Sequence, residues 1–366
     1  MQPVRGRGNK VIRYAVVGAG WISQEAFMPA VAATGNSRMQ AIVSGSADSA
    51  RRLAEFHGVP EVVGYADYDA LCASDRIDAV YVALPNSMHA DFAIRALRSG
   101  KHVMVEKPLA TTLAQSRDMI AAARESGALL MTAYRLHNEP GTHAMLEAVR
   151  AGRIGDPLYV AATFGFQAQS GNHRLEAGHW GGPLPDVGVY CLNAARHVFG
   201  AEPLAVQAMA SRPEGDARFG EIEASLAVTL RFPGERLAQF FCSFGSALSE
   251  SLRVVGTAGE LIMDPAFRFE SAMTLTLRSG GTQSVQNFPH VDHFAGQIAY
   301  FSDCIAQGRQ PEADGEEGLS DMRALLAIER AARTGETVVL QPRDFGPAIT
   351  PDMRRSLPVT QRRLVL

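Results

Sequence analysis

The stretch VIRYAVVGAGWIS, residues 11–23, decides the fold class of the first third of the chain. An apolar run leads directly into Gly18 and Gly20, and a helical pattern follows. Gly18 permits a tight strand-to-helix turn, and Gly20 lets the backbone approach a pyrophosphate at the helix N-terminus. A glycine motif in this setting predicts a dinucleotide site, with Trp21 and Ile22 as further cofactor contacts.

The remainder of the first third repeats the same alternation of short apolar runs and amphipathic segments. Further buried strands are expected at 39–45, 78–84, 101–106 and 128–134, and helices at 21–34, 47–58, 87–99 and 112–126. Strands separated by helices form βαβ units and therefore a parallel sheet. The expected fold class is α/β, with a doubly wound Rossmann domain over residues 10–136.

The rhythm changes after residue 136. Two β-rich runs, SLAVTLRF and RLAQFFCSF, are joined by PGE, which is a hairpin signal. We expect an α+β domain over 137–340 with one large, mainly antiparallel open sheet. Its strands are expected at 157–166, 203–211, 222–232, 236–246, 251–256, 259–263 and 273–278, and its helices at 140–151, 293–308 and 317–334. A tail, 341–366, has little pattern and is expected either to lie along a neighbouring subunit or to be mobile.

Composition narrows the class of protein. The chain has 366 residues, 46% of them hydrophobic and 20% charged, with a net charge of −3. This balance is typical of a soluble globular protein, and the net charge argues against nucleic-acid or membrane partners. The sequence shows no apolar segment of the ~20 residues that span a bilayer. Neither a secretory signal nor a CxxC pair is recognised in it. We therefore expect a cytoplasmic protein whose four cysteines are reduced.

The end of the second strand bears on which dinucleotide binds. In AIVSGSADSARR the strand ends with Ser44, Gly45 and Ser46, where an NAD-specific site would carry a carboxylate for the ribose diol. The serines offer hydroxyls, and Arg51 or Arg52 could supply charge for a 2′-phosphate. NADP is favoured over NAD, although Asp48 lies nearby and the arginines could simply form a solvated helix face.

Two later motifs supply reactive groups. In KHVMVEKP, Lys107 follows a buried strand at the sheet edge where ligands bind. In GGPLPDVGVYCLN, residues 181–193, Asp186, Tyr190 and Asn193 share one helix face. A phenol titrates near ~10, so Tyr190 needs a cation such as Lys107 to act as a base. Asp186 could accept a hydrogen bond from the substrate or fix Lys107, and Asn193 is expected to be structural or orienting.

Taken together, the GAG turn, LPNSMHADFAIRALRSGKHVMVEKP, GGPLPDVGVYCLN and EEGLSDMRALLAIERAARTG resemble the glucose–fructose oxidoreductase and inositol dehydrogenase family. The resemblance covers about residues 10 to 340 and is strongest to the branch of NADP-dependent glucose–fructose and aldose–aldose oxidoreductases. It implies oxidation of an aldose at C1 to the lactone with tightly bound NADP, and reduction of a second sugar or carbonyl compound.

The resemblance also implies roles for residues. The nicotinamide ribose is lined by Leu84, Pro85, Asn86 and His89. Glu106 and Lys107 lie beside the nicotinamide, with a cis peptide before Pro108, and Tyr134 and Arg135 lie at the mouth of the site. Substrate contacts are expected from Lys107, Tyr134, Asp186 and Tyr190. Independently of the resemblance, the polar and aromatic loop GNHRLEAGHW before the helix could bring Arg174 and Trp180 to the substrate, or it could be a surface excursion.

This sequence departs from the family pattern at three positions. Trp180 and Pro183 replace smaller residues, which leaves the pocket shape open, and Tyr190 stands where many members carry His. Alternative functions are a D-xylose, glucose or diol dehydrogenase with exchangeable NADP, an NAD(P)-dependent glycosidase, and a cofactor-binding sensor. A metal site is not expected, and the HVDH motif at 290–293 is interpreted as structural. The open sheet predicts a homodimer or homotetramer.

Overall fold

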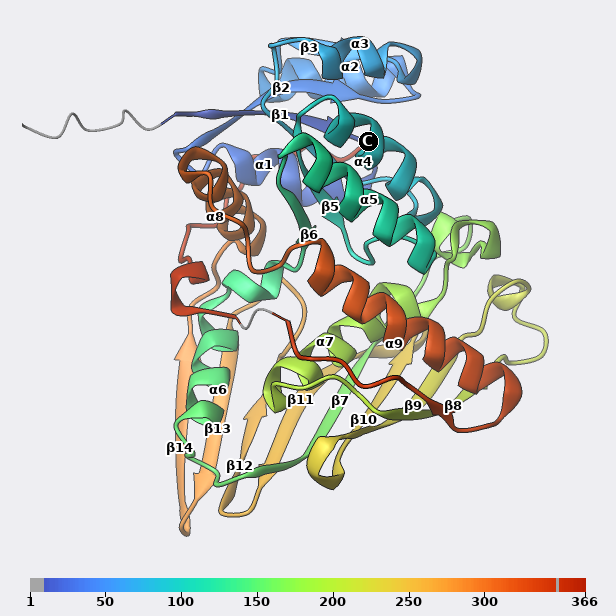
Figure 1. Ribbon diagram of the computed structural model, residues 1–366, viewed down its shortest axis with the longest axis vertical. Helices are drawn as coiled ribbons and strands as arrows, with labels where there is room; N and C mark the ends of the chain where they lie inside the picture. The colour runs from blue at the N-terminus through green and yellow to red at the C-terminus, as the bar shows by residue number, and fades with distance from the viewer. Residues whose placement is uncertain (1–9, 347–348) are drawn as a thin grey trace, which may run out of the picture.

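The computed structural model describes residues 10–346 and 349–366, which form two β-sheets with helices around them (Figure 1). The first sheet is parallel and six-stranded, in the order β3-β2-β1-β4-β5-β6. This order confirms the predicted doubly wound fold. Its strands are β1 (Ile12–Val17), β2 (Ser37–Val43), β3 (Glu61–Val63), β4 (Ala79–Val82), β5 (His102–Glu106) and β6 (Leu130–Ala133).

The helices between these strands are α1 (Met28–Val31), α2 (Ala47–His57), α3 (Tyr68–Ala73), α4 (His89–Arg98) and α5 (Leu113–Ser126). The expected helix 21–34 is shorter, and a π-helical turn over Ser23–Phe27 precedes α1. The sequence analysis missed β3 and α3, because three and six residues are too few to show a period. Helix α5 begins where the Thr112 side chain accepts a hydrogen bond from the Gln115 N–H, as an N-cap does.

One helix lies elsewhere than its place in the sequence suggested. Helix α8 (His293–Gln307) was expected in the second domain, but it packs on the first sheet beside α1 (Figure 1). The Tyr14 and Ser302 hydroxyls are 2.8 Å apart, and Asn36 donates to Asp303. The nucleotide-type sheet is thus completed by residues almost 300 positions after its first strand, so the division at residue 136 stays a proposal.

The second sheet has nine strands in the order β14-β13-β12-β11-β7-β10-β9-β8-β15. Only β7 and β10 pair in parallel, so the sheet is mainly antiparallel, as predicted. Helices α6 (Pro140–Arg150), α7 (Val189–Phe199) and α9 (Gly315–Thr334) cover one face (Figure 1). The strands are β7 (Pro157–Gln167), β8 (Ala205–Ser211), β9 (Ser225–Phe232), β10 (Arg236–Ser243), β11 (Gly245–Gly256), β12 (Gly259–Met263), β13 (Met273–Ser279), β14 (Thr282–Phe288) and β15 (Val338–Val339).

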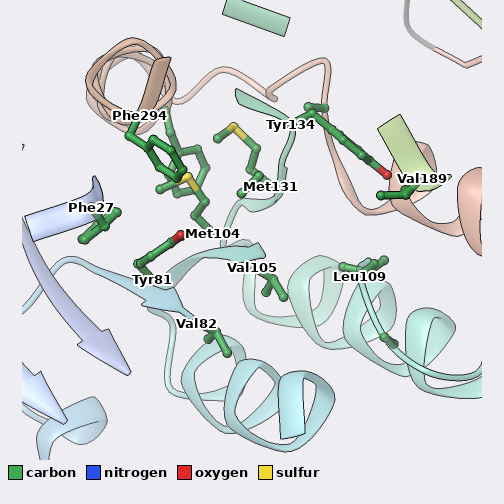
Figure 2. Packing of buried hydrophobic residues seen from close by; sticks show 14 of the residues in the cluster. Phe27, Tyr81, Val82, Met104, Val105, Leu109, Met131, Tyr134, Val189 and Phe294 are labelled. Carbon is green, nitrogen blue, oxygen red and sulfur yellow. The ribbon is translucent and has the colours of Figure 1, made fainter. Parts of the chain in front are cut away.

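A continuous buried core joins the two layers (Figure 2). Phe27 stacks on Tyr81 with ring centroids 3.8 Å apart, and Phe294 of α8 packs into the same cluster. All four cysteines are buried and free, and their reduced state stays a prediction. Within the part of the chain that the structure describes, every helix is too short or too polar to cross a membrane.

The end of the tail lies on the nucleotide-binding half of its own chain. Arg363 forms an ion pair with Glu25, and the Leu366 N–H donates to Gln24 Oε1 at 2.6 Å. Gln24 in turn donates to the carbonyl of Ala19, inside the glycine turn. Figure 1 shows the C-terminus in this half of the molecule. The end of the tail therefore packs on its own chain, whereas the sequence suggested that it lies along a neighbouring subunit or is mobile.

Candidate active site

The glycine turn has the geometry that a dinucleotide site requires. Gly18 has φ +94°, and a Cβ there would lie 2.5 Å from the Ala83 carbonyl oxygen, so only glycine fits. A Cβ on Gly20 would meet nothing within 4 Å, which leaves its outer side open to a ligand. The Ser23 hydroxyl donates to the Gly18 carbonyl at 2.6 Å, and this hydrogen bond links the two ends of the turn.

The end of β2 presents hydroxyls without a carboxylate on the strand itself. The Ser44 hydroxyl accepts a hydrogen bond from the Ser46 N–H at 3.1 Å, and the ring of Tyr65 packs closely against Gly45. Arg51 is exposed and paired with Asp48 at 2.7 Å. The pairing reduces the free charge that Arg51 offers, so its role as a phosphate ligand stays a prediction.

Residues after the glycine turn face the second half of the chain. Trp21 is 49% exposed, and its ring lies 6.2 Å from that of Phe269, in the loop before β13. Ile22 is half-buried against the core. After β4, the Asn86 amide donates to the Trp180 carbonyl at 3.0 Å. The loop that carries Trp180 is therefore fastened to the residues that follow β4.

Lys107 is held at the centre of the site, at the end of β5. Its ammonium donates to Asp186 Oδ1 at 2.9 Å and to the Asp186 carbonyl at 2.7 Å. Arg174 approaches the other carboxylate oxygen at 3.2 Å. The peptide between Lys107 and Pro108 is cis, as expected. Of the two roles considered for Asp186, fixing Lys107 is therefore the one that the geometry supports.

The charges of this cluster support one another. Burial alone would raise the pKa of Asp186, but Lys107 and Arg174 hold it at about 2. Burial likewise opposes the charge on Lys107, but Asp186, Tyr190 and Glu106 raise its pKa above the ordinary value. Lys107 is therefore a cation and Asp186 an anion throughout the neutral range.

Tyr190 lies between two cations at the start of α7. Lys107 Nζ is 4.9 Å and the Arg135 guanidinium 4.8 Å from the centre of its ring. Phe164 of β7 meets the ring edge-on at 5.7 Å. The structure thus brings together Lys107, Asp186 and Tyr190, as the sequence predicted, from segments about 80 residues apart. The turn Leu184–Gly188 before α7 is π-helical and carries Asp186.

One cofactor prediction changes in character. Leu84, Pro85 and Asn86 lie where β4 ends, but the His89 side chain is fully buried, with Nε2 2.8 Å from the Leu84 carbonyl oxygen and Nδ1 2.9 Å from the Pro108 carbonyl oxygen, to one of which a neutral ring donates. Burial lowers the pKa of His89 to about 4, so the ring is neutral. The expected direct contact of His89 is therefore wrong. Its ring instead ties together the two loops beside the site.

Glu106 faces inward. Its carboxylate accepts a hydrogen bond from the Tyr81 hydroxyl, and burial raises its pKa. The position beside Lys107 agrees with the sequence analysis, and contact with the nicotinamide stays a prediction.

Tyr134 and Arg135 do not lie at the mouth of the site, because both are 4% exposed. Tyr134 points toward α7, with its hydroxyl near Val189 (Figure 2), and donates to Asp321 at 2.6 Å. That hydroxyl hydrogen is therefore not available to donate to a substrate. Arg135 lies between the rings of Tyr190 and Phe269 and contacts the loop before β13.

Asn193 is structural, as expected. Its amide donates to Glu317 and Asp321 at 2.9 and 3.0 Å, and its carbonyl oxygen accepts from His137 at 2.7 Å. The same acids bind the fully buried Arg196.

The network brings His137, His197 and Glu317 within 4.8 Å of one another, close enough for metal ligands, which the sequence analysis did not foresee. Because Arg196 already neutralises Glu317, this cluster is better described as an ion-pair network. In the HVDH motif, His293 contacts Arg135 at 3.0 Å, and His290 bonds to the Phe269 carbonyl at 2.7 Å.

Sequence reasoning missed the aromatic wall formed by Phe164, Phe267 and Phe269. Phe164 and Phe267 stack with centroids 5.4 Å apart, and both rings contact Tyr190. These residues come from β7 and from a loop a hundred positions later. Their local patterns are those of ordinary core residues, so nothing in the sequence marks them.

Comparison with known proteins identifies relatives that cover most of the chain. The profile of the oxidoreductase family with an NAD-binding Rossmann fold matches residues 12–134, and that of the GFO/IDH/MocA C-terminal domain matches 142–262. A D-xylose 1-dehydrogenase [NADP(+)] from Haloarcula marismortui is 30% identical over 337 residues, covering 90% of this chain and 93% of the relative.

Solved structures agree. An aldose–aldose oxidoreductase from Caulobacter crescentus, complexed with glycerol, has a TM-score of 0.86 at 35% identity, covering 90% of this chain and all of the other. A 3-ketoreductase from Actinomadura kijaniata, in complex with NADP and TDP-benzene, has a TM-score of 0.80 at 30% identity, covering 87% and 97%. Since two family profiles and relatives of at least 30% identity span both halves, the chain belongs to the GFO/IDH/MocA family of oxidoreductases.

Proposed function

We propose that this chain is an NADP-dependent sugar oxidoreductase that oxidises an aldose at C1 to the lactone. The observation that carries the proposal is the fixed Lys107 ammonium, held by Asp186 and lying 4.9 Å from the Tyr190 ring at the carboxyl end of the first sheet. Ligands of open α/β sheets bind at this edge. The relatives named above act on sugars and related carbonyl compounds, which supports the substrate class.

The residues of the dinucleotide turn fit NADP. The open outer side of Gly20 and the helix N-terminus that follows suit a pyrophosphate. Ser44 and Ser46 end β2 where a carboxylate would repel a 2′-phosphate. Gly18, Gly20, Trp21, Ser44 and Ser46 would hold the cofactor, with Ile22, Gly45, Arg51, Leu84, Pro85, Asn86, Glu106 and Arg135 around it. When bound, the nicotinamide accepts the hydride from the sugar.

The side chains of this chain manage the proton and the developing charge. Oxidation of the C1 hydroxyl breaks its O–H bond and the adjacent C–H bond; the proton passes to a base, and the two electrons leave with the hydride. Tyr190 is the group placed to take the proton, and the Lys107 cation stabilises negative charge on the phenol or on the sugar oxygen. Asp186 keeps Lys107 in position, and the Arg174 and Trp180 loop faces the sugar.

The chain can complete its cycle by reducing a second sugar on the same cofactor or by exchanging cofactor freely. We favour the first, because the tail contacts the glycine turn through Gln24 and would slow exchange. A D-xylose or diol dehydrogenase with exchangeable NADP is the second candidate, favoured by the named relative from Haloarcula. Retention of Lys107, Asp186 and Tyr190 in one cluster argues against a sensor.

Denaturing the purified protein and measuring the released nucleotide distinguishes the two candidates. One NADP(H) per chain supports a retained cofactor and exchange of hydride between two sugars. An empty protein that turns over with added NADP+ and D-xylose supports the dehydrogenase, and recovery of NAD in its place contradicts the NADP assignment.

We also propose a homodimer or homotetramer formed through the open face of the second sheet. Met209, Leu237 and Phe241 are 79%, 42% and 38% exposed on its strands β8 and β10. Large exposed apolar groups on one surface are typical of an interface, and light scattering of the purified protein tests this. A cytoplasmic location stays a prediction.

A further inference from the structure

A buried carboxylate lies on β11 at a position where the strand pattern predicts an apolar side chain. Glu250 alternates with Leu252 and Val254, so the three side chains point to the same face of the sheet. Leu252 and Val254 are buried, and the Glu250 side chain is 4% exposed. Glu250 also lies opposite Phe164 of β7 in the strand register, which places it on the face of the sheet that meets Tyr190.

The carboxylate binds the loop between β12 and β13. Glu250 Oε2 accepts hydrogen bonds from the backbone N–H groups of Phe267 and Arg268 at 2.6 and 2.7 Å. Glu250 Oε1 lies 2.7 Å from the Arg268 guanidinium. Hydrogen bonds from N–H groups to an ionised carboxylate are roughly twice as strong as those between neutral groups. One side chain thus fixes the loop backbone at Phe267 and at the residue after it.

The loop in turn contacts the group proposed to take the proton. The Phe267 ring lies 6.3 Å from the Tyr190 ring and stacks on Phe164. The Phe267 carbonyl oxygen accepts a hydrogen bond from Arg135, whose guanidinium lies 4.8 Å from the centre of the Tyr190 ring. The ring of Phe269 lies 5.2 Å from the same guanidinium. A displacement of this loop therefore displaces both a ring and a cation that pack on Tyr190.

From these contacts we infer that Glu250 is a positioning residue for the reaction, which holds Phe267 and Arg135 against Tyr190 by binding the loop before β13. The inference rests on the proposed function, in which Tyr190 takes the proton from the sugar. A misplacement of ~1 Å at a reacting group can lower the rate about 10²-fold. Because the phenol acts in the step that moves the proton, its position affects kcat more than the binding of the sugar.

Three variants and a control separate the contacts of Glu250. Glu250→Ala leaves both N–H groups without their acceptor, so kcat for oxidation of D-xylose by NADP+ should fall about 10- to 100-fold, with KM within about threefold. Glu250→Gln keeps an oxygen that accepts from both N–H groups, and Arg268→Met removes only the ion pair, so both should retain kcat within about threefold. The matched control is Glu260→Ala on β12, whose carboxylate pairs with Arg253 and Arg278.

A double variant shows whether the effect passes through Tyr190. In Tyr190→Phe the proton acceptor is already missing, so adding Glu250→Ala should change kcat by less than about twofold, whereas independent effects multiply. We express kcat per NADPH-binding site, counted by fluorescence titration, so that a loss of folded protein does not enter the comparison. Multiplication of the two effects contradicts the inference.

A spectroscopic readout does not depend on turnover. Trp21 and Trp180 are the two tryptophans of the chain, and the Trp21 ring lies 6.2 Å from the ring of Phe269. With 5-fluorotryptophan incorporated, the fluorine resonance of Trp21 is assigned by its loss in Trp21→Phe. It should shift in Glu250→Ala, because the loop moves, and stay in place in Glu250→Gln and Glu260→Ala.

The outcomes separate the two claims. If D-xylose reacts and Glu250→Ala retains kcat, or if Glu250→Gln loses as much as Glu250→Ala, the positioning role is refuted while the proposed function stands. If D-xylose does not react with the wild-type protein, the proposed function fails, and the fluorine resonance alone decides. A shift in Glu250→Ala but not in Glu250→Gln supports the hold of Glu250 on the loop, and an unmoved resonance or an equal shift in both refutes it.

Discussion

At the scale of single residues, the site depends on a charged side chain, that of Lys107, which is buried despite the desolvation free energy that burial costs. Lys107 is 9% exposed at its side chain, and both its neighbours and its pKa show that it stays protonated. The buried ammonium stays charged because it donates two hydrogen bonds to Asp186, one to the carboxylate and one to the backbone carbonyl. The same charge faces Tyr190, which connects the folding role of the pair with its chemical role.

Replacing Lys107 tests the chemical role. We expect Lys107→Met to lower kcat by about 10²–10⁴-fold, because the phenol loses its cation, while binding of NADP changes little. Steady-state kinetics and equilibrium titration of NADPH fluorescence measure the two effects. The control is Arg124→Met, an exposed partner of Glu316 far from the site. Full activity in Lys107→Met contradicts the role assigned to the ammonium.

The lowered pKa of Asp186 predicts how the free energy of unfolding changes at acid pH. Its pKa is about 2 in the fold and near 3.9 unfolded, so its charge stabilises the fold above pH ~4 and this contribution is lost as the pH falls toward 2. Asp186→Asn should lower the free energy of unfolding by about 2 kcal/mol at pH 7. The difference from wild type should disappear near pH 2, as urea unfolding at several pH values can show. A difference that persists at pH 2 would point to lost packing instead.

At the scale of elements, the loop before α7 is shaped by a close backbone approach. A Cβ on Gly181 would lie 2.3 Å from the Arg174 carbonyl oxygen, whereas one on Gly178 would meet nothing within 4 Å. Gly181→Ala must therefore shift the segment that carries Arg174. We expect the KM for the aldose to rise about tenfold or more, with Gly178→Ala near wild type. Equal kinetics in the two variants would show that this loop does not bind the sugar.

The contacts between α7 and α9 predict an effect on stability alone. Arg196 is fully buried and paired with Glu202, Glu317 and Asp321 at 2.5–2.8 Å. Removing one partner from such a network leaves charges of the opposite sign buried without a counter-charge. Arg196→Met should lower the free energy of unfolding by about 3–5 kcal/mol, whereas Arg231→Met, an exposed partner of Glu235, costs under ~1 kcal/mol. Denaturant unfolding measures both, and a small loss in Arg196→Met contradicts a stabilising network.

The elements also show how far sequence reasoning reaches. The long parallel strands and the grouping of Asp186 with Tyr190 were predictable, because the hydrophobic period of a strand or helix lies within one continuous stretch of sequence. Strand β14 was not, because TQSVQNF is exposed along almost its whole length and shows no buried alternation. Likewise, Tyr134 was misplaced because a tyrosine after a strand looks the same whether it faces the cleft or Asp321.

At the scale of the whole molecule, distant segments complete each half. Helix α8 covers the first sheet, the tail ends at Gln24, and the loop before β13 places Phe267 beside Tyr190. Local patterns cannot report such contacts, since they depend on how the two sheets pack. The resemblance to a family located the reactive residues, but the aromatic wall beside Tyr190 emerged only from the assembled fold.

Transfer of deuterium from C1-deuterated D-xylose tests the central claim most directly. The protein, loaded with NADP+, is mixed with the labelled sugar for one turnover, and the reduced nucleotide and the sugar product are analysed by mass spectrometry. The account predicts one deuterium in NADPH and xylonolactone or its acid as the product, with both formed about 10²–10⁴-fold more slowly by Lys107→Met. Unlabelled NADPH, or reduction of NAD+ alone, would contradict it.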